Sequence, residues 1–297
     1  MLVCGGLRVR EAIDPDLRLS ADEQAYVNEA LNLSHGTYGD FHWPPGTPVM
    51  FAASRVFDRD RDLPAAYWFQ ALVGTLTILA AFGIAAVAAG SIAGLLAAAL
   101  VAFYQPFWIL SGSLQSEPLG TLLLALAMLA VVWALRRDGR LRWWALAGAL
   151  FGLAILTRTD LILAPAIVAA VAALALWRRD RDARAAARPA AALLAEYALC
   201  LAPWVVFASH QTGHFTPVTE GDAPALFVGT YLPGDGTTGG MKEALGDRVR
   251  AANPRLRNVK NYNLPAGEVL DYVAKHERPG MPRDDALRAE AKENLRR

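Results

Sequence analysis

Two neighbouring acidic residues near the start of the chain are the first candidates for chemistry. Asp22 and Glu23 lie in the stretch 20–30, which begins with Ser20. A serine followed three residues later by a glutamate is a capping box, so we predict that a helix begins here with both carboxylates in its first turn. A carboxylate with a suitable pKa can act as a general base. The alternative is that both acids only stabilise the positive end of the helix.

Two further motifs hold polar groups between apolar stretches. Glu117 lies in a Ser-Glu-Pro turn, where it is either a site residue or a simple interface residue, and the proline favours the start of a helix. Arg158 is the one basic residue of segment 65–208 outside two arginine-rich loops. Its guanidinium matches the oxygens of a phosphate, so it is a candidate for binding an anionic headgroup. The alternative is a local ion pair with Asp160.

A proline-rich motif follows the acidic pair and contains another candidate, His42. Three prolines within residues 44–48 predict a stiff, extended entry to a short apolar helix over 49–57. That helix is too short to span a membrane and is suited to lie along its surface, the alternative being a rigid linker. Elsewhere, His210 and His214 are four residues apart but lack a third ligand, so no metal site is predicted there.

The composition indicates which kind of fold must position these groups. Hydrophobic residues make up 54% of the 297 residues and charged residues 19%, whereas soluble domains have about 45–50% and about 25%. The net charge of +1 excludes a nucleic-acid binder driven by bulk charge. Most of the apolar excess lies in runs that approach or reach the length of a membrane span. The runs are 65–89, 92–110, 118–135, 143–157, 161–177 and 190–208. We therefore predict an all-α polytopic membrane protein with about six spans.

The arginine-rich loops predict the orientation of this protein in the membrane. Residues 136–142 contain four arginines and residues 178–188 contain five, so both loops are expected to face the cytoplasm. We then expect three regions: an extracytoplasmic first loop at 1–64 with the acidic pair and a juxtamembrane helix, a transmembrane helical core at 65–208, and an extracytoplasmic tail at 209–297. Residues 1–64 contain no span that would carry them across a membrane, so we expect the chain to be a fragment that a further helix precedes.

The order of the motifs resembles the GT-C superfamily of membrane glycosyltransferases. The resemblance rests on the Asp-Glu pair with the following Tyr26, the Pro-Pro-Gly entry, the Ser-Glu-Pro turn and the Gly-Leu-Ala-Ile-Leu-Thr-Arg run that ends at Arg158. Pro203-Trp204 and the segment after it are also similar. The branch that contains protein O-mannosyltransferases and aminoarabinose transferases, or glycosyltransferase family 39, is the most similar one. The resemblance covers residues 17–235.

This resemblance implies a GT-C-like helix bundle and an activity. The enzyme would move a sugar from a polyprenyl-phosphate-linked donor to a lipid, glycan or protein acceptor on the extracytoplasmic face of the cell membrane. It would invert the anomeric carbon, with or without the help of a divalent metal. Asp22 would be the general base and Glu23 would assist or orient it. Arg158 would bind the leaving phosphate. The other candidates would also bind substrate: Glu117, His42 and Tyr26.

Two other classes of function compete with the glycosyltransferase. A polytopic transporter or lipid-carrier flippase would be expected to show repeated halves and polar residues at the membrane midplane. The sequence has no such repeat, and its polar candidates gather at one predicted face. A non-catalytic membrane assembly subunit is the other alternative.

Overall fold

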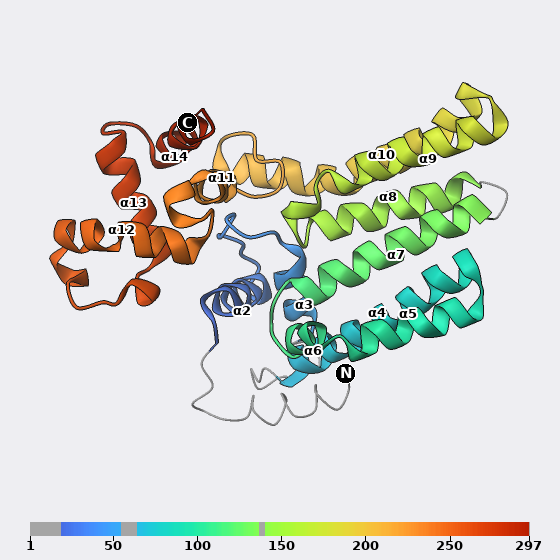
Figure 1. The fold of residues 1–297 in the computed structure, drawn as a ribbon, viewed down its shortest axis with the longest axis horizontal. Coiled ribbons are helices and arrows are strands. Elements are labelled where there is room, and N and C mark those ends of the chain that lie inside the picture. Colours follow the sequence, from blue (N-terminus) through green and yellow to red (C-terminus); the bar gives the residue numbers. More distant parts are fainter. Residues whose placement is uncertain (1–18, 55–63, 137–139, 297) are drawn as a thin grey trace. The chain divides into compact units, whose positions relative to one another are not determined.

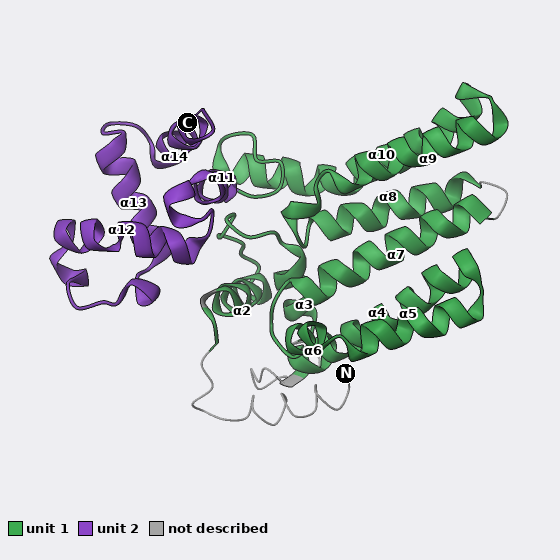
Figure 2. Ribbon diagram, viewed as in Figure 1, with its two compact units in different colours: residues 1–219 green, residues 220–297 purple. Residues whose placement is uncertain are grey.

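A computed structural model describes residues 19–54, 64–136 and 140–296 of the chain. Every regular element in this part is a helix. The expectations for residues 1–18 and for the middle of the first arginine-rich loop lie outside the described residues. The chain divides into two compact units, residues 1–219 and 220–297 (Figure 2), and each is described by itself.

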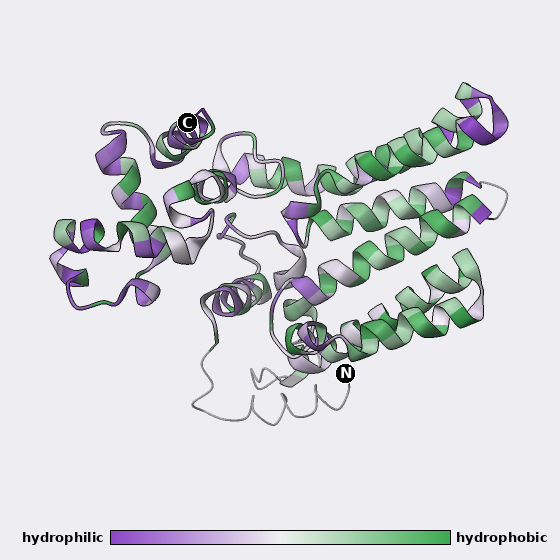
Figure 3. Ribbon diagram, in the orientation of Figure 1, coloured by the Kyte–Doolittle hydropathy of each residue, from purple (hydrophilic) through white to green (hydrophobic). Residues whose placement is uncertain are grey.

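The first unit contains the apolar helices. Within the described residues, four helical segments are long and apolar enough to cross a membrane. They are Ala65–Ala89 in α4 (Pro64–Ala89), Glu117–Arg136 (α7), Thr159–Asp180 in η1 (Thr159–Leu161) and α9 (Ala164–Asp180), and Ala183–Thr212 (α10). Large apolar side chains on these helices remain exposed, as a lipid-facing surface requires. Hydrophobic residues follow one another along the length of these helices (Figure 3). The all-α polytopic membrane class is therefore confirmed.

Two of the six predicted runs are not simple spans. The run 92–110 forms α5 (Ser91–Phe103) and α6 (Gln105–Ser111), which are bent by 66°. The break lies at Tyr104, whose backbone is extended, and Pro106 lacks the N–H that would bond to the carbonyl of Ala102 and continue α5. The run 143–157 forms α8 (Leu141–Ile155), whose 15 residues span about 22 Å. Such a helix is shorter than a hydrocarbon layer of about 30 Å.

The apolar helices pack side by side in a layered order (Figure 1). α4 contacts α5 and α7, α7 contacts α8, and α10 contacts both α8 and α9. α8 approaches α10 closely at two glycines four residues apart, because a glycine has no side chain to hold the two helices apart. A Cβ atom on Gly148 would lie 2.1 Å from the carbonyl oxygen of Leu193, and one on Gly152 would lie 2.6 Å from Cβ of Cys200.

The two ends of this bundle contain different polar segments. The end of α7, the start of α8 and the turn between α9 and α10 lie at one end (Figure 1), and the described residues of the arginine-rich loops lie there. α2 (Ala21–Ser34) and α3 (Gly46–Ser54) lie at the other end. The arrangement agrees with the expectation that both arginine-rich loops share one side of the membrane.

α2 and α3 pack on each other, and together with the start of α4 and the loop at 112–116 they enclose a small core. Its buried side chains are Tyr26, Ala30, Phe51, Ala66, Tyr67 and Leu114. α3 begins at Gly46, three residues earlier than predicted, so Pro48 lies in its first turn, where a proline costs little. The end of the predicted helix, residues 55–57, lies outside the described residues.

The second unit is a bundle of short helices. They are α11 (Asp222–Thr230), η2 (Leu232–Gly234), α12 (Thr238–Ala252), η3 (Pro254–Leu256), η4 (Asn261–Asn263), α13 (Ala266–Glu277) and α14 (Arg283–Asn294). Their core contains Phe227, Met241, Leu264 and Leu287, each at most 2% exposed. These helices are mostly polar outside the core, unlike those of the first unit (Figure 3).

Candidate functional site

The predicted capping box at the start of α2 is present. The Ser20 amide donates to Oε2 of Glu23 at 2.8 Å, and the Glu23 amide donates to the Ser20 hydroxyl at 3.4 Å. The second oxygen of Glu23, Oε1, accepts a 2.9 Å hydrogen bond from the Leu114 amide. Gln115 also donates to the Ser20 hydroxyl, at 3.1 Å. Glu23 therefore fastens the start of α2 to the loop at 112–116.

A buried amide holds the same loop from the other side. Gln70 on α4 is fully buried, and its Nε2 donates to the carbonyls of Ser113 at 3.1 Å and Gln115 at 2.7 Å. Sequence reasoning missed Gln70, although a lone amide within the apolar run 65–89 was a usable signal, because polar groups are rare in such runs. Gln70 fixes the loop that leads directly into Glu117.

Arg158 is the centre of an ionic cluster at this end of the bundle. Its Nη1 lies 2.6 Å from Oε1 of Glu117, and its Nη2 lies 2.8 Å from Oδ2 of Asp160. Arg158 also donates from Nε to Asp160 at 3.1 Å and from Nη1 to the Ser116 hydroxyl at 3.4 Å. The local pair with Asp160, one of the two alternatives from the sequence, is thus present, and it coexists with a longer-range pair to Glu117.

Two glycines make room for this cluster. A Cβ atom on Gly120 would lie 2.7 Å from Cδ of Arg158, so the bare backbone of α7 lets the arginine side chain pass over it. The Gly46 amide donates to the carbonyl of Leu156 at 2.7 Å, and a Cβ on Gly46 would lie 2.5 Å from Oγ1 of Thr157. The Pro-Pro-Gly entry therefore rests on the turn that carries Arg158.

Asp22 lies in the first turn of α2 and close to this cluster. Partial burial raises the pKa of Asp22 first of all, and the carboxylates of Glu117 and Glu23 raise it further, while His42 lowers it. Within the described residues, no group donates a hydrogen bond to the Asp22 carboxylate. The raised pKa of this carboxylate makes it a stronger base than an isolated aspartate.

Tyr26 and His42 both contact the ring of Trp43. Tyr26 lies one helical turn after Asp22, is 4% exposed and meets the Trp43 ring edge to face at 5.4 Å. Burial raises the pKa of Tyr26, while a hydrogen bond with Ser116 lowers it and links the phenol to the Arg158 cluster. His42 is exposed and meets the Trp43 ring at 5.1 Å. The predicted site residues are thus brought together from four separate motifs.

The charge of the site is unbalanced. The guanidinium of Arg158 is paired with Glu117 and Asp160. The Asp22 carboxylate interacts with the carboxylates of Glu117 and Glu23 instead. The second oxygen of Glu117, Oε2, is buried and has no partner in the described part of the chain. Among the described residues, no group of three or more His, Cys, Asp or Glu side chains is placed to hold a metal ion. Among the described residues of the site, carboxylates therefore outnumber strong cations, and Arg158 is the one strong cation there.

The comparison with protein families gives a match over the core of this site. Residues 44–207 match the family described as dolichyl-phosphate-mannose-protein mannosyltransferase. The match covers more than half of the chain, from the Pro-Pro-Gly entry through Glu117 and Arg158 into α10, and begins after α2. No curated protein and no solved structure matches the chain. The chain belongs to the dolichyl-phosphate-mannose-protein mannosyltransferase family, which is a family of membrane glycosyltransferases of the GT-C type.

Proposed function

We propose that this protein transfers a sugar from a polyprenyl-phosphate-linked donor to a hydroxyl or amine of a lipid, glycan or protein acceptor, on the extracytoplasmic face of the membrane. The observation that carries the proposal is the docking of the first turn of α2 beside the Arg158 cluster. This contact brings the Asp22 carboxylate close to Glu117, the ion-pair partner of Arg158, at the bundle end opposite the turn between α9 and α10. A lipid-linked mannose is the first donor to test, since the family is described by it.

Asp22 is the general base of the proposed reaction. A lone pair of the acceptor oxygen or nitrogen attacks the anomeric carbon, the acceptor proton passes to the Asp22 carboxylate, and the bond from the anomeric carbon to the phosphate oxygen breaks. The bonding electrons leave with the polyprenyl phosphate. A single displacement of this kind inverts the anomeric centre. The raised pKa of Asp22 supports this role, because a more basic carboxylate accepts the proton more readily.

Arg158 stabilises the negative charge that develops on the leaving phosphate. Its Nε and Nη2 both donate to Asp160, whose side chain is 58% exposed, whereas its Nη1 donates to Glu117 and Ser116. A phosphate has the same bidentate geometry as a carboxylate. We infer that the donor phosphate takes the place of Asp160, while Glu117 and Ser116 keep the other edge of the guanidinium in position.

The remaining site residues position these two. Glu23 keeps α2 on the loop at 112–116 through its contacts with Ser20 and Leu114. Tyr26 supports the cluster through Ser116. His42 faces Asp22 and limits the rise of its pKa.

The test is sugar transfer by the full chain in lipid nanodiscs. The donor is polyprenyl-phosphate mannose labelled in the sugar, and solubilised lipid and protein from the source membranes serve as acceptors. Asp22→Asn should lower the rate about 10²–10⁴-fold, and the wild-type rate should fall as the pH falls through the pKa of Asp22. Asn28→Ala, an exposed change further along α2, should leave the rate unchanged.

Two results would contradict the proposal. Unchanged transfer by Asp22→Asn removes Asp22 from the mechanism. Movement of labelled donor across the bilayer without a new covalent product favours the flippase instead.

A further inference from the structure

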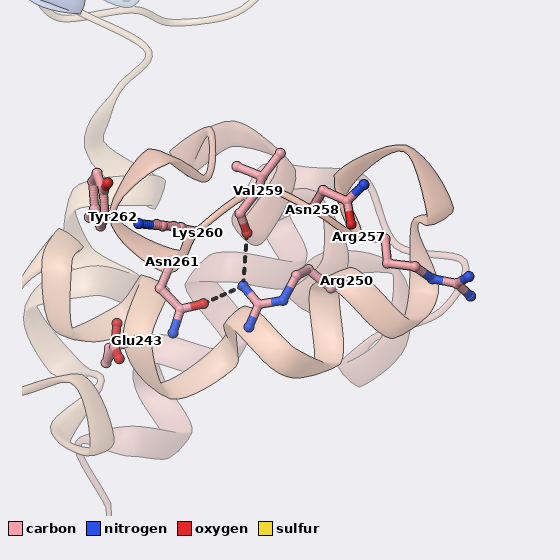
Figure 4. A pocket seen from close by; sticks show the side chains of 8 residues that line it. All are labelled: Glu243, Arg250, Arg257, Asn258, Val259, Lys260, Asn261 and Tyr262. Atoms are coloured by element: carbon pink, nitrogen blue, oxygen red, sulfur yellow. Dashed lines mark hydrogen bonds between the residues drawn. The ribbon is translucent and has the colours of Figure 1, made fainter.

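The second unit contains a shallow polar groove that the proposed reaction does not use. Its volume is about 470 Å³, and it lies between α12 and the segment 257–262 (Figure 4). The lining residues are Glu243, Arg250, Arg257, Asn258, Val259, Lys260, Asn261 and Tyr262. All of them belong to the second unit, so the groove is a separate feature from the Asp22–Arg158 site.

The wall of the groove is anchored in the core of the unit. Leu264 is 1% exposed, and Leu256 and Val259 pack against the same core, so the wall segment is held at three points along its length. Arg250 on α12 donates to the Val259 carbonyl at 3.2 Å and to Oδ1 of Asn261. The shape of the groove is therefore set before a ligand arrives, which lowers the cost of binding.

A glycine fixes the direction of the Asn261 amide. A Cβ atom on Gly246 would lie 2.2 Å from Oδ1 of Asn261, so the amide lies directly on the backbone of α12. Because Oδ1 accepts from Arg250, the amide nitrogen points to the other side, toward Glu243 (Figure 4). The groove thus presents an oriented hydrogen-bond donor.

The other groups around this amide complete a mixed set. The Tyr262 side chain is 69% exposed and offers the face of an aromatic ring. Lys260 supplies a further donor and Glu243 an acceptor, and neither is paired within the described residues. The charge of Arg250 is already met by an ion pair with Asp247.

We propose that this groove is a binding site for a saccharide. A pyranose ring has a C–H face that packs on an aromatic ring and a rim of hydroxyls, each of which both donates and accepts. The amide of Asn261 and the ammonium of Lys260 donate to such hydroxyls, and the carboxylate of Glu243 accepts from them. Three cations, Arg250, Arg257 and Lys260, line the groove with one carboxylate, so inorganic phosphate is the competing ligand that the test must exclude. The inference stands without the transferase activity, since no residue of the first unit takes part.

The test uses the full chain in nanodiscs and saturation-transfer difference NMR. The probes are methyl glycosides of mannose, glucose, galactose and N-acetylglucosamine. At least one should give transfer signals, with a millimolar dissociation constant typical of a shallow site. Tyr262→Ala should weaken binding about fivefold or more, and Tyr262→Phe, which keeps the ring, should weaken it less. Met281→Ala, which truncates another half-exposed apolar side chain of the unit, should leave binding unchanged.

The outcomes separate this inference from the proposed reaction. Asp22→Asn should abolish sugar transfer and leave the NMR signals intact. The inference is overturned if none of the four glycosides gives a signal. It is overturned equally if Tyr262→Ala binds as well as wild type, if Met281→Ala loses as much as Tyr262→Ala, or if inorganic phosphate displaces the bound glycoside.

Discussion

The Asp22–Arg158 site and the groove of the second unit are built in opposite ways. The first joins side chains from α2, the turn before α7 and the turn after α8, which are far apart in the sequence. The groove uses two neighbouring stretches, α12 and residues 257–262, and the hydrogen bonds between its lining residues span at most 11 residues. Long-range assembly makes a site depend on the packing of the whole bundle, whereas local assembly makes it depend on one short segment.

The two regions also treat charge differently. In the first, the guanidinium of Arg158 is paired with two carboxylates, and one carboxylate oxygen of Glu117 is buried without a partner in the described residues. In the second, three cations and one carboxylate line the groove, and one of the cations, Arg250, is paired with Asp247. A donor phosphate must therefore displace a carboxylate to reach the guanidinium of the first region, whereas a neutral saccharide in the groove needs no such exchange.

Among the changes that compare the two regions, removal of the Arg158 guanidinium should have the largest effect. Arg158→Ala should lower sugar transfer about 10²–10³-fold, because the leaving phosphate loses its charge stabilisation and Glu117 is left unpaired. Arg158→Lys keeps the charge but not the bidentate geometry, so its rate of transfer should lie between those of the wild type and Arg158→Ala. Arg250→Ala is the matched change in the second unit and should leave transfer unchanged. If Arg158→Ala and Arg250→Ala lowered the rate of transfer equally, the proposal that only the first region takes part in transfer would be contradicted.

The sequence predicted the ingredients of the first site better than its assembly. The capping box at Ser20 and Glu23 is a local signal, and the all-helical apolar core follows from composition, so both were readable. The contact of Gly46 with the turn before Arg158 was not, because nothing local encodes a hydrogen bond across more than a hundred residues. The break between α5 and α6 was predictable in principle, because Pro106 has no N–H with which to continue α5. The groove was missed because its residues form no known motif.

Alanine substitutions at two glycines, Gly148 and Gly246, should have intermediate effects, which differ because different atoms lie against the two glycines. On Gly148, a Cβ would meet the backbone carbonyl of Leu193 on a neighbouring helix, which cannot move without shifting α10. Gly148→Ala should therefore lower the free energy of unfolding by about 1–3 kcal/mol. On Gly246, the obstacle is the end of the Asn261 side chain, which can rotate away. Gly246→Ala should cost much less stability but abolish binding in the groove.

Thermal unfolding in nanodiscs, followed by circular dichroism, measures the first quantity, and the NMR assay measures the second. The contrast fails if Gly246→Ala destabilises the protein as much as Gly148→Ala does, because local and long-range packing would then carry the same cost.

The smallest effect should come from the carboxylate that a donor phosphate is proposed to replace. Asp160 is the more exposed partner of Arg158 and occupies two of its N–H groups, so it competes with the phosphate for the same edge of the guanidinium. Asp160→Asn removes the charge of this competitor and should strengthen binding of polyprenyl phosphate about threefold to tenfold, in line with the modest energies of exposed ion pairs. Asp180→Asn, at an exposed pair with Arg179 next to the second arginine-rich turn, is the matched control and should change nothing. Inhibition of transfer by added polyprenyl phosphate measures the affinity. A weaker affinity in Asp160→Asn would mean that Asp160 holds Arg158 in its binding position and that the phosphate does not take its place.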